Sequence, residues 1–138
     1  MVYEPNQCPI RSGLGVFGDR WSLLIIRDMM FRDFERFQNF LDAGEGISTN
    51  ILYDRLSRLE AQHIISRQKD PSNGHQVLYE LTDQGKDLLP VVLPIIGWAE
   101  KNDPRTNVSS AFAKRIRTDL TGVSAERLAA LRQSDMEC

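Results

Sequence analysis

The residues best suited to contact another molecule begin at position 48. Ser48, Thr49, Asn50 and Tyr53 place hydroxyl, amide and phenol groups in one short stretch. An asparagine amide can form two hydrogen bonds with the edge of an adenine, and a threonine methyl group can contact the methyl group of a thymine. These side chains therefore predict contacts with base edges in the major groove of duplex DNA, provided that one helix presents them together. The alternative is an ordinary solvated helix face.

Cationic side chains follow at Arg67, Lys69 and His75, on either side of the segment Pro71–Gly74. A hairpin that carries cations beside a helix in the major groove can contact phosphates or the minor groove. The alternative is an exposed hairpin whose charges serve solubility, and Asp70 in the same loop slightly favours it. We favour the DNA contact.

Two further arginines have open alternatives. Arg55 lies in the same predicted helix as Asn50 and either binds a phosphate or anchors the helix by a salt bridge to the body of the domain. Arg20 begins another predicted helix, where free backbone N–H groups also favour a phosphate, but it has Asp19 as a neighbouring partner. Asp54 is expected to pair with an arginine one helical turn later rather than with a cytosine.

Cys8 precedes a proline, and proline is favoured at the first position of a helix, so Cys8 is the expected N-cap. Free N–H groups and the helix dipole stabilise a thiolate there, and Arg11 lies nearby. Cys8 is therefore a candidate sensor of oxidants or electrophiles, with an inert, half-buried cap at a dimer seam as the alternative. Cys138 is a candidate resolving thiol at the other end of the chain.

These residues need elements to position them. The periodicity of apolar residues predicts, in chain order, helices over about 9–17, 20–30 and 34–41, a glycine turn at 44–46, and a helix over 48–60. Asp19 and Ser48 are the expected N-caps of the second and fourth helices, because their oxygens can accept free backbone N–H groups. Leu52, Leu56 and Leu59 are the expected buried face of the fourth helix.

Two segments of alternating polarity, 64–69 and 77–81, follow the fourth helix, and Asn73-Gly74 between them is typical of a hairpin turn. Helix, turn, capped helix and hairpin predict a winged helix-turn-helix. The fold class is accordingly mainly α with a small β-hairpin wing.

Thr82 is expected to cap a long helix that runs to about Glu100 and is bent by Pro90 and Pro94. The apolar surface of this helix is too broad for one buried face, which predicts a second subunit. The expected organisation is a DNA-binding and dimerisation domain over 1–102 and a helical extension over 103–138.

The extension has two weaker helical patterns, roughly 109–120 and 124–133. A basic cluster at Lys114, Arg115 and Arg117 faces away from its apolar positions, and its roles include an extra DNA contact, a swapped dimer arm or a solvated helix. We rank the dimer arm first, because the apolar positions need a partner.

The composition and charge of the chain bear on which classes of protein it can belong to. The net charge of −2 and the pI near 5.7 weigh mildly against a general nucleic-acid binder, but a regulator needs only a local basic surface. No apolar run approaches the roughly 18 to 20 residues of a membrane span, and the chain starts without a signal pattern, so we expect a cytoplasmic protein. His63 and His75 are isolated and the cysteines lack metal-ligand spacing, so we expect no enzyme, cofactor or metal.

Over about residues 8–100 the chain resembles the HxlR-type winged-helix transcriptional regulators. The matching pieces are Cys8-Pro9, Gly18-Asp19-Arg20-Trp21, Arg36-Phe37, Gly46-Ile47-Ser48, Leu52, Arg55-Leu56, Leu59-Glu60, Tyr79-Glu80-Leu81-Thr82, Gly85, Leu89-Pro90 and Trp98. The glycines at 13 and 15 depart from the family pattern, and the resemblance says nothing about the chain beyond Asn102.

The resemblance implies a homodimer that binds a pseudo-palindromic operator. Its interface would involve Ile10 and Leu14 of the first family helix and Leu93, Ile96 and Trp98 of the last. Members commonly sense electrophiles, oxidants or small molecules, and several depend on the cysteine at the position of Cys8.

Two alternatives remain at the level of function. A winged-helix module that binds protein rather than DNA is favoured by the acidic net charge, and a steep salt dependence of DNA binding would discriminate against it.

The aromatic residues Trp21, Phe31, Phe34, Phe37, Phe40 and Trp98 are expected to form core and dimer seam, with a pocket for a small hydrophobic effector between subunits as the alternative.

Overall fold

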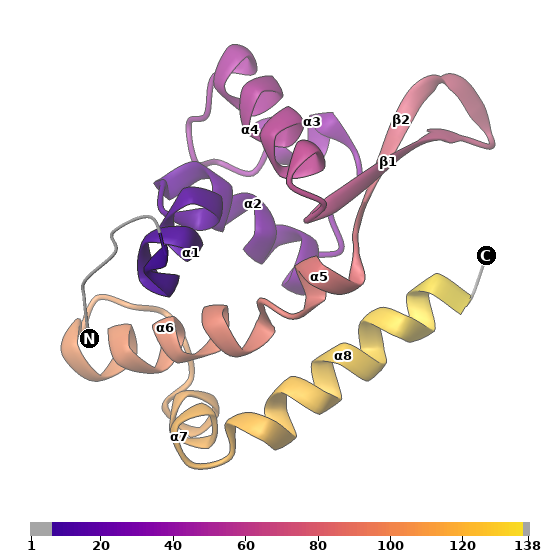
Figure 1. The fold of residues 1–138 in the computed structure, drawn as a ribbon. Helices are drawn as coiled ribbons and strands as arrows, with labels where there is room; N and C mark the ends of the chain where they lie inside the picture. Colours follow the sequence, from indigo (N-terminus) through magenta and orange to yellow (C-terminus); the bar gives the residue numbers. More distant parts are fainter. Residues whose placement is uncertain (1–6, 137–138) are drawn as a thin grey trace. The chain divides into compact units, whose positions relative to one another are not determined.

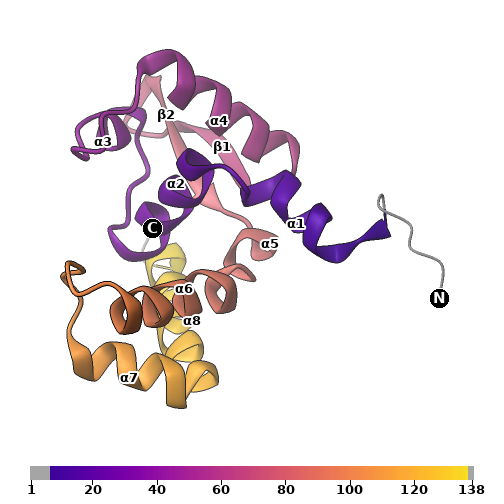
Figure 2. The same ribbon diagram turned by 90° about the vertical axis from the view of Figure 1, so that its left-hand side faces the viewer.

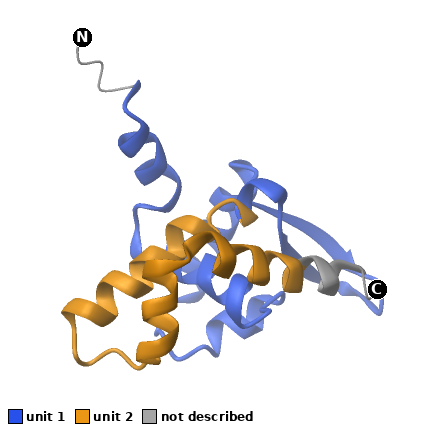
Figure 3. Ribbon diagram, turned by 90° about the horizontal axis from the view of Figure 1, so that it is seen from below, with its two compact units in different colours: residues 1–85 blue, residues 86–138 orange. Residues whose placement is uncertain are grey.

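The computed structural model describes residues 7–136, and their side chains as far as residue 131. Its elements are α1 (Pro9–Phe17), α2 (Arg20–Phe31), α3 (Phe37–Leu41), α4 (Thr49–Ala61), β1 (Ile65–Asp70), β2 (Asn73–Leu81), α5 (Asp83–Lys86), α6 (Leu89–Asn102), α7 (Ser110–Thr118) and α8 (Leu120–Met136) (Figure 1). The chain forms two compact units, residues 1–85 and 86–138 (Figure 3). The predicted winged helix-turn-helix is confirmed in the first unit.

Helix α2 is the central element of the first unit, where it contacts α1, α4 and β2. Asp19 caps it as predicted: the carboxylate accepts hydrogen bonds from the backbone N–H groups of Trp21 and Ser22. Ile26 and Met30 have no exposed surface. Apolar side chains around much of the circumference therefore make α2 the core on which the other helices rest.

The helix-turn-helix consists of the short α3, a glycine turn and α4. Gly44 and Gly46 have φ angles of +86° and +78°, a region that side chains with a Cβ rarely adopt. The Ser48 hydroxyl then accepts the backbone N–H of Ile51 at 3.2 Å, which confirms the predicted N-cap. The predicted buried face of α4 is also confirmed, since Leu52, Leu56 and Leu59 are all buried.

The wing is an antiparallel hairpin in which Ile65 pairs with Leu81 and Lys69 with Val77. The prediction of a turn at Asn73-Gly74 is wrong, because the strands are joined through positions 71 and 72 and Asn73 already pairs with Asp70. The cause is local: the Asp70 carboxylate accepts the Ser72 backbone N–H at 2.9 Å and the Ser72 hydroxyl at 2.7 Å, which closes the turn early. Figure 1 shows the hairpin extending away from the helices of its unit.

The predicted long helix from Thr82 to Glu100 is wrong, because two helices occupy this segment. Thr82 does cap a helix, accepting the Gly85 N–H at 3.0 Å, but that helix is the short α5. A turn at positions 87 and 88 follows, and Pro90 stands in the first turn of α6. Proline has no N–H to donate to the preceding turn but suits the start of a helix, so it starts α6 instead of bending a longer one. Pro94 does lie inside α6, as predicted.

The second unit consists of α6, α7 and α8, which pack against one another. Buried side chains come from all three, with Leu93 from α6, Ile116 from α7 and Val123 from α8. Gly97 allows a close approach, since a Cβ there would lie 3.2 Å from Cγ of Arg117. The Arg117 guanidinium donates to the Gly97 carbonyl at 2.8 Å.

The two helices of the extension confirm the helical patterns beyond position 108, although the second begins earlier than predicted. Their apolar residues pack within their own unit, so the reason for ranking a swapped dimer arm first is removed. Among the described residues, none of the helices combines the length and the apolar character that crossing a membrane requires.

Candidate nucleic-acid interface

The face of α4 opposite its buried leucines is exposed and polar. Thr49, Asn50 and Tyr53 all lie on the surface, and Tyr53 is 62% exposed although it is a large aromatic residue. Ser48 is exposed as well, but its hydroxyl already accepts the Ile51 N–H. The structure thus brings the four predicted base-contacting residues to the first turns of one helix, with three of them projecting from the surface.

Arg55 anchors α4 to the body of the domain. Its Nε donates to the Asp19 carboxylate at 2.9 Å, and its guanidinium also pairs with Asp54. The side chain is only 21% exposed. Of the two alternatives left open for Arg55, the described contacts correspond to the salt bridge.

The Asp19 carboxylate is the most heavily hydrogen-bonded group of this surface. Besides Arg55 and two backbone N–H groups, it accepts the Ser22 hydroxyl at 2.6 Å. Burial would raise the pKa of Asp19, but the hydrogen bonds from Ser22 and from Arg55 outweigh it and lower the pKa to about 2. The hydrogen bond to Asp19 likewise raises the pKa of the Arg55 guanidinium. This ion pair is therefore fully charged at neutral pH.

Arg20 takes a different partner from the one considered in the sequence. Its guanidinium lies over the ring of Trp21, 4.6 Å from the ring centre, and the residue is exposed. Such a cation–π contact holds an arginine while its N–H groups stay available to an anion. Arg20 therefore presents a positive charge at the start of α2.

The three basic residues of the wing are all exposed, and one of them lies near a carboxylate. Arg67 lies 3.5 Å from the Glu60 carboxylate, whereas Lys69 and His75 lie on the surface. Asp70 is not a free negative charge among them: its carboxylate pairs with Arg36 at 2.6 Å, and the hydrogen bonds from Ser72 together with Arg36 lower its pKa to about 2. The carboxylate that counted against a DNA contact thus fixes the base of the wing loop.

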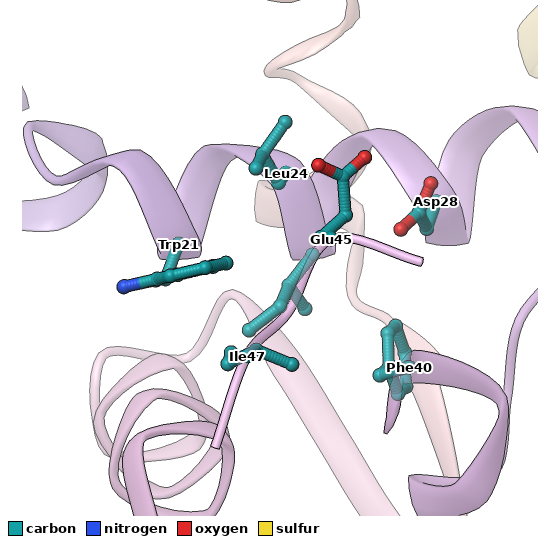
Figure 4. A pocket seen from close by; sticks show the side chains of 7 residues that line it. Trp21, Leu24, Asp28, Phe40, Glu45 and Ile47 are labelled. Atoms are coloured by element: carbon teal, nitrogen blue, oxygen red, sulfur yellow. The ribbon is translucent and has the colours of Figure 1, made fainter. Parts of the chain in front are cut away.

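A third ion pair holds the glycine turn. Arg27 of α2 donates to the Glu45 carboxylate at 2.9 Å, and Figure 4 shows this carboxylate directed toward α2. A small pocket beside this pair is lined by Trp21, Leu24, Ile25, Asp28, Phe40, Glu45 and Ile47 (Figure 4). Its volume of about 10 Å³ holds about one water molecule. This pocket therefore has no room for a small-molecule effector.

Cys8 stands at the N-cap of α1, as predicted, but its side chain makes no capping hydrogen bond. The residue is half-buried and its thiol is free. Cys138, the candidate resolving thiol, lies outside the described residues. Within the described part of the chain, no group of three or more histidine, cysteine, aspartate or glutamate residues could hold a metal ion.

The residues predicted for a dimer interface divide into exposed and buried ones. Ile10 and Leu14 of α1 are 71% and 56% exposed, and Trp98 of α6 is 69% exposed. Ile96 is half-buried, and Leu93 has no exposed surface in the chain. Figures 2 and 3 show α1 standing out from the rest of the first unit, and none of its residues is buried.

Sequence reasoning missed the anchoring role of Asp19, Arg27 and Arg36. Asp19 was expected as a cap and as a possible partner of Arg20, but its actual partner Arg55 is remote in the sequence and no local pattern joins the two. The pairs of Arg27 with Glu45 and of Arg36 with Asp70 likewise join residues far apart in the sequence, so no local pattern predicts them.

Known proteins with similar sequences have the helix-turn-helix that the structure shows. Residues 16–107 match the HxlR-like helix-turn-helix family. An HTH-type transcriptional regulator of Synechocystis is 36% identical over 86 residues, which cover 62% of this chain and 63% of that protein. The chain thus spans a little under two thirds of that relative's length. The HTH-type transcriptional regulator YodB of Bacillus subtilis is 34% identical over 97 residues, which cover 70% of this chain and 86% of YodB.

Solved structures of transcriptional and redox regulators have a similar fold. The reduced form of YodB superposes with a TM-score of 0.59 at 32% identity, covering 73% of this chain and 99% of that one. The redox regulator HypR in its oxidised form superposes with a TM-score of 0.62 at 31% identity, covering 73% and 100%. YodB with bound quinone superposes with a TM-score of 0.57 at 33% identity, covering 69% and 99%.

Proposed function

This chain belongs to the HxlR-like helix-turn-helix family and is a DNA-binding transcriptional regulator, and from that premise we propose that it acts as a homodimer on a pseudo-palindromic operator. The observation that carries the proposal is the exposed polar face at the start of α4. In a symmetric dimer two such helices enter successive major grooves on one side of the duplex, about 34 Å apart.

In this proposal each of the four residues at the start of α4 has a part in binding DNA. Asn50 hydrogen-bonds an adenine, Thr49 contacts a thymine methyl group, and Tyr53 packs on the bases or the sugar beside them. Ser48 keeps its capping bond and offers its remaining hydrogen-bonding capacity to a phosphate. The contacts of Asn50, Thr49 and Tyr53 decide which sequence is bound.

The cations beside α4 supply affinity rather than specificity. Arg20 at the start of α2 and Lys69 and His75 on the wing contact phosphates, since all three are exposed. Arg67 contributes a phosphate contact as well, at the expense of its 3.5 Å approach to Glu60. Arg55 supports the interface from behind through Asp19.

The dimer is proposed to form through α1 and α6. Ile10 and Leu14 on α1, and Trp98 on α6, are large, apolar and exposed, and a second subunit would cover each of them. Of the other predicted residues of α6, Ile96 is half-buried and Leu93 is buried, so Ile96 is the one with surface left for a partner. Residues 1–102 would thus carry DNA binding and dimerisation, while residues 103–138 pack on α6 and stiffen it.

Cys8 is proposed to make the regulator responsive to oxidants or electrophiles. The support is its half-buried position at the start of the exposed α1, together with relatives described as a redox regulator and as a quinone-bound regulator. Modification of the thiol would displace α1 and change the spacing of the two α4 helices. A small hydrophobic effector in the dimer groove is the alternative trigger. We expect Cys8→Ser to fold and bind DNA but to lose the response, and a full response in this variant would remove Cys8 from the mechanism.

The proposed function is tested by fluorescence anisotropy with DNA from upstream of the protein's own gene and with a scrambled duplex, over a range of salt concentrations. We expect selective binding whose logarithm falls linearly with the logarithm of the salt concentration. A selection from random duplexes supplies an operator if the upstream DNA contains none. Equal, weak binding of all duplexes, even after selection, would contradict the proposal.

A further inference from the structure

Asp19 lies where three helices of the first unit meet. It directly follows Gly18, the C-cap of α1, whose N–H donates to the Leu14 carbonyl at 2.8 Å. Its carboxylate caps α2 through the N–H groups of Trp21 and Ser22. The same carboxylate accepts the Arg55 guanidinium from α4 at 2.9 Å. Asp19 therefore follows the end of α1 through the backbone, and its side chain joins the start of α2 to the middle of α4.

We propose that Asp19, acting through Arg55, is a positioning residue that fixes the direction of α4 relative to α1 and thereby sets the operator half-site spacing that the dimer accepts. This inference rests on the proposed function and deepens it. It assigns Arg55 to orientation of the DNA-contacting helix rather than to a phosphate.

A second polar contact joins the same two helices. The Gln62 side-chain amide, at the C-cap of α4, donates to the Gly15 carbonyl of α1 at 3.2 Å. Arg55 and Gln62 lie about two helical turns apart and therefore share one side of α4. Two anchor points along one side of a helix restrain the two angles that set the direction of its axis, whereas a single point lets the helix pivot about that point.

Apolar packing alone does not fix these two angles. The buried leucines set how deep α4 lies on the core, but a row of similar apolar side chains allows a helix to shift along its groove. Beside the glycine turn that leads into α4, the core leaves a small pocket, and the ion pair between Arg27 and Glu45 spans this part of the structure. Directional hydrogen bonds between charged groups supply the restraint that packing lacks.

The arrangement links the proposed dimer helix to the DNA-contacting helix. Helix α1 buries none of its residues fully, so a partner that packs against Ile10 and Leu14 can change its direction. Because α1 ends at Gly18, any change in its direction reaches Asp19 through one peptide unit. Asp19 then passes the change to α4 through the ion pair.

The test compares Asp19→Asn, Arg55→Gln, Arg55→Lys and the double variant Asp19→Asn/Arg55→Gln. Asparagine is as good an N-cap as aspartate, so Asp19→Asn removes the ion pair and keeps the cap. Arg58→Gln is the matched control, because Arg58 is an exposed arginine of α4 whose nearest described carboxylate is that of Asp54 at 3.8 Å. Each protein is assayed for operator affinity, for affinity to a scrambled duplex, for thermal unfolding and on operators whose half-site spacing differs by single base pairs.

We expect Asp19→Asn and Arg55→Gln each to lose about tenfold in operator affinity, within the range of measured coupling energies, with affinity for the scrambled duplex nearly unchanged. The double variant should lose no more than either single variant, because both remove the same contact. The preference for one half-site spacing should broaden in all three, and Arg55→Lys should recover part of it. Arg58→Gln should keep the wild-type spacing preference.

Three results would overturn the proposal. Wild-type affinity and spacing preference in Asp19→Asn would show that the ion pair positions nothing. Loss of affinity for both duplexes in Arg55→Gln, with a salt slope lower by about one, would make Arg55 a phosphate contact. A loss of operator affinity that is fully accounted for by the fraction of unfolded protein would show that the ion pair only stabilises the fold. Failure of the proposed function is seen separately, since the wild-type protein would then select no operator, and the positioning role would fall with it.

Discussion

At the scale of single residues, Asn50 and Lys69 should separate base recognition from phosphate contact. Asn50→Ala is expected to lose about 1–3 kcal/mol of operator binding and to keep its affinity for a scrambled duplex, because a base contact carries sequence information. Lys69→Ala should weaken binding to both duplexes alike and lower the salt slope. Fluorescence anisotropy on both duplexes measures these effects, and equal losses in the two variants on both duplexes would refute the division of roles.

The carboxylate of Asp19 should leave a mark on acid stability. Its pKa is lowered to about 2 in the folded protein, whereas an unfolded aspartate titrates near about 4, so the pair stabilises the fold above that value and the contribution is lost as the pH falls toward 2. We expect Asp19→Asn to be less stable than the wild type at pH 7 and the difference to shrink between about pH 4 and pH 2.

Urea unfolding at a series of pH values measures this convergence. Asp87→Asn serves as the control for loss of a carboxylate, since Asp87 lies exposed in the turn before α6. A difference between wild type and Asp19→Asn that stayed constant down to pH 2 would mean that the ion pair contributes nothing to folding.

The sequence predicted which residues are polar and exposed better than it predicted their partners. Ser48 and Asp19 were identifiable as caps because a cap depends on the residues that follow within one turn. The partnership of Asp19 with Arg55, and that of Asp70 with Arg36, joins residues far apart in the sequence, so it depends on the packed fold. Local patterns therefore give candidate residues for a site, and tertiary structure decides which of them stay free to bind.

At the scale of elements, two glycines should respond in opposite directions to the same substitution. Gly46 has a φ of +78°, so Gly46→Ala should cost about 1–2 kcal/mol of stability. Gly15 is helical and nothing lies within 4 Å of a Cβ placed there, so Gly15→Ala should stabilise α1 by up to about 1 kcal/mol. Thermal unfolding of both variants tests this pair. Destabilisation by Gly15→Ala would instead indicate that a partner helix packs closely on that glycine.

The elements that sequence reasoning misplaced were decided by single residues. Pro90 starts α6 rather than bending a longer helix, and Ser72 closes the wing turn before the expected Asn73-Gly74 pair. The helix and the hairpin were both predicted, but their boundaries were not. Pro90 could bend a helix or start one, and the hairpin could turn at Asn73-Gly74 or at the two residues before it. Long periodic segments such as α2 and α4, where many residues agree, were predicted nearly to their ends.

At the scale of the whole molecule, the exposed apolar residues predict how assembly can be disrupted. Ile10→Glu and Trp98→Glu should each give folded monomers, because the wild-type side chains are largely exposed within the chain and a charge there costs nothing until a partner covers it. Analytical ultracentrifugation measures the change, and circular dichroism checks the fold. Ile116→Glu is the contrasting case, since Ile116 is buried and this variant should unfold the second unit. Dimers that persist in both surface variants would place the interface elsewhere.

The exposure of α1 has a consequence for gene control. Helix α1 buries none of its residues within the chain. If a second copy covers it, as we propose, the DNA-competent species should accumulate as the square of protein concentration when dimers are scarce. Halving the expression of the gene would then reduce that species about fourfold, by mass action. A promoter under such a regulator responds to gene copy number more steeply than in direct proportion. A cell could thus switch its target genes through a modest change in synthesis of the regulator, without any chemical signal.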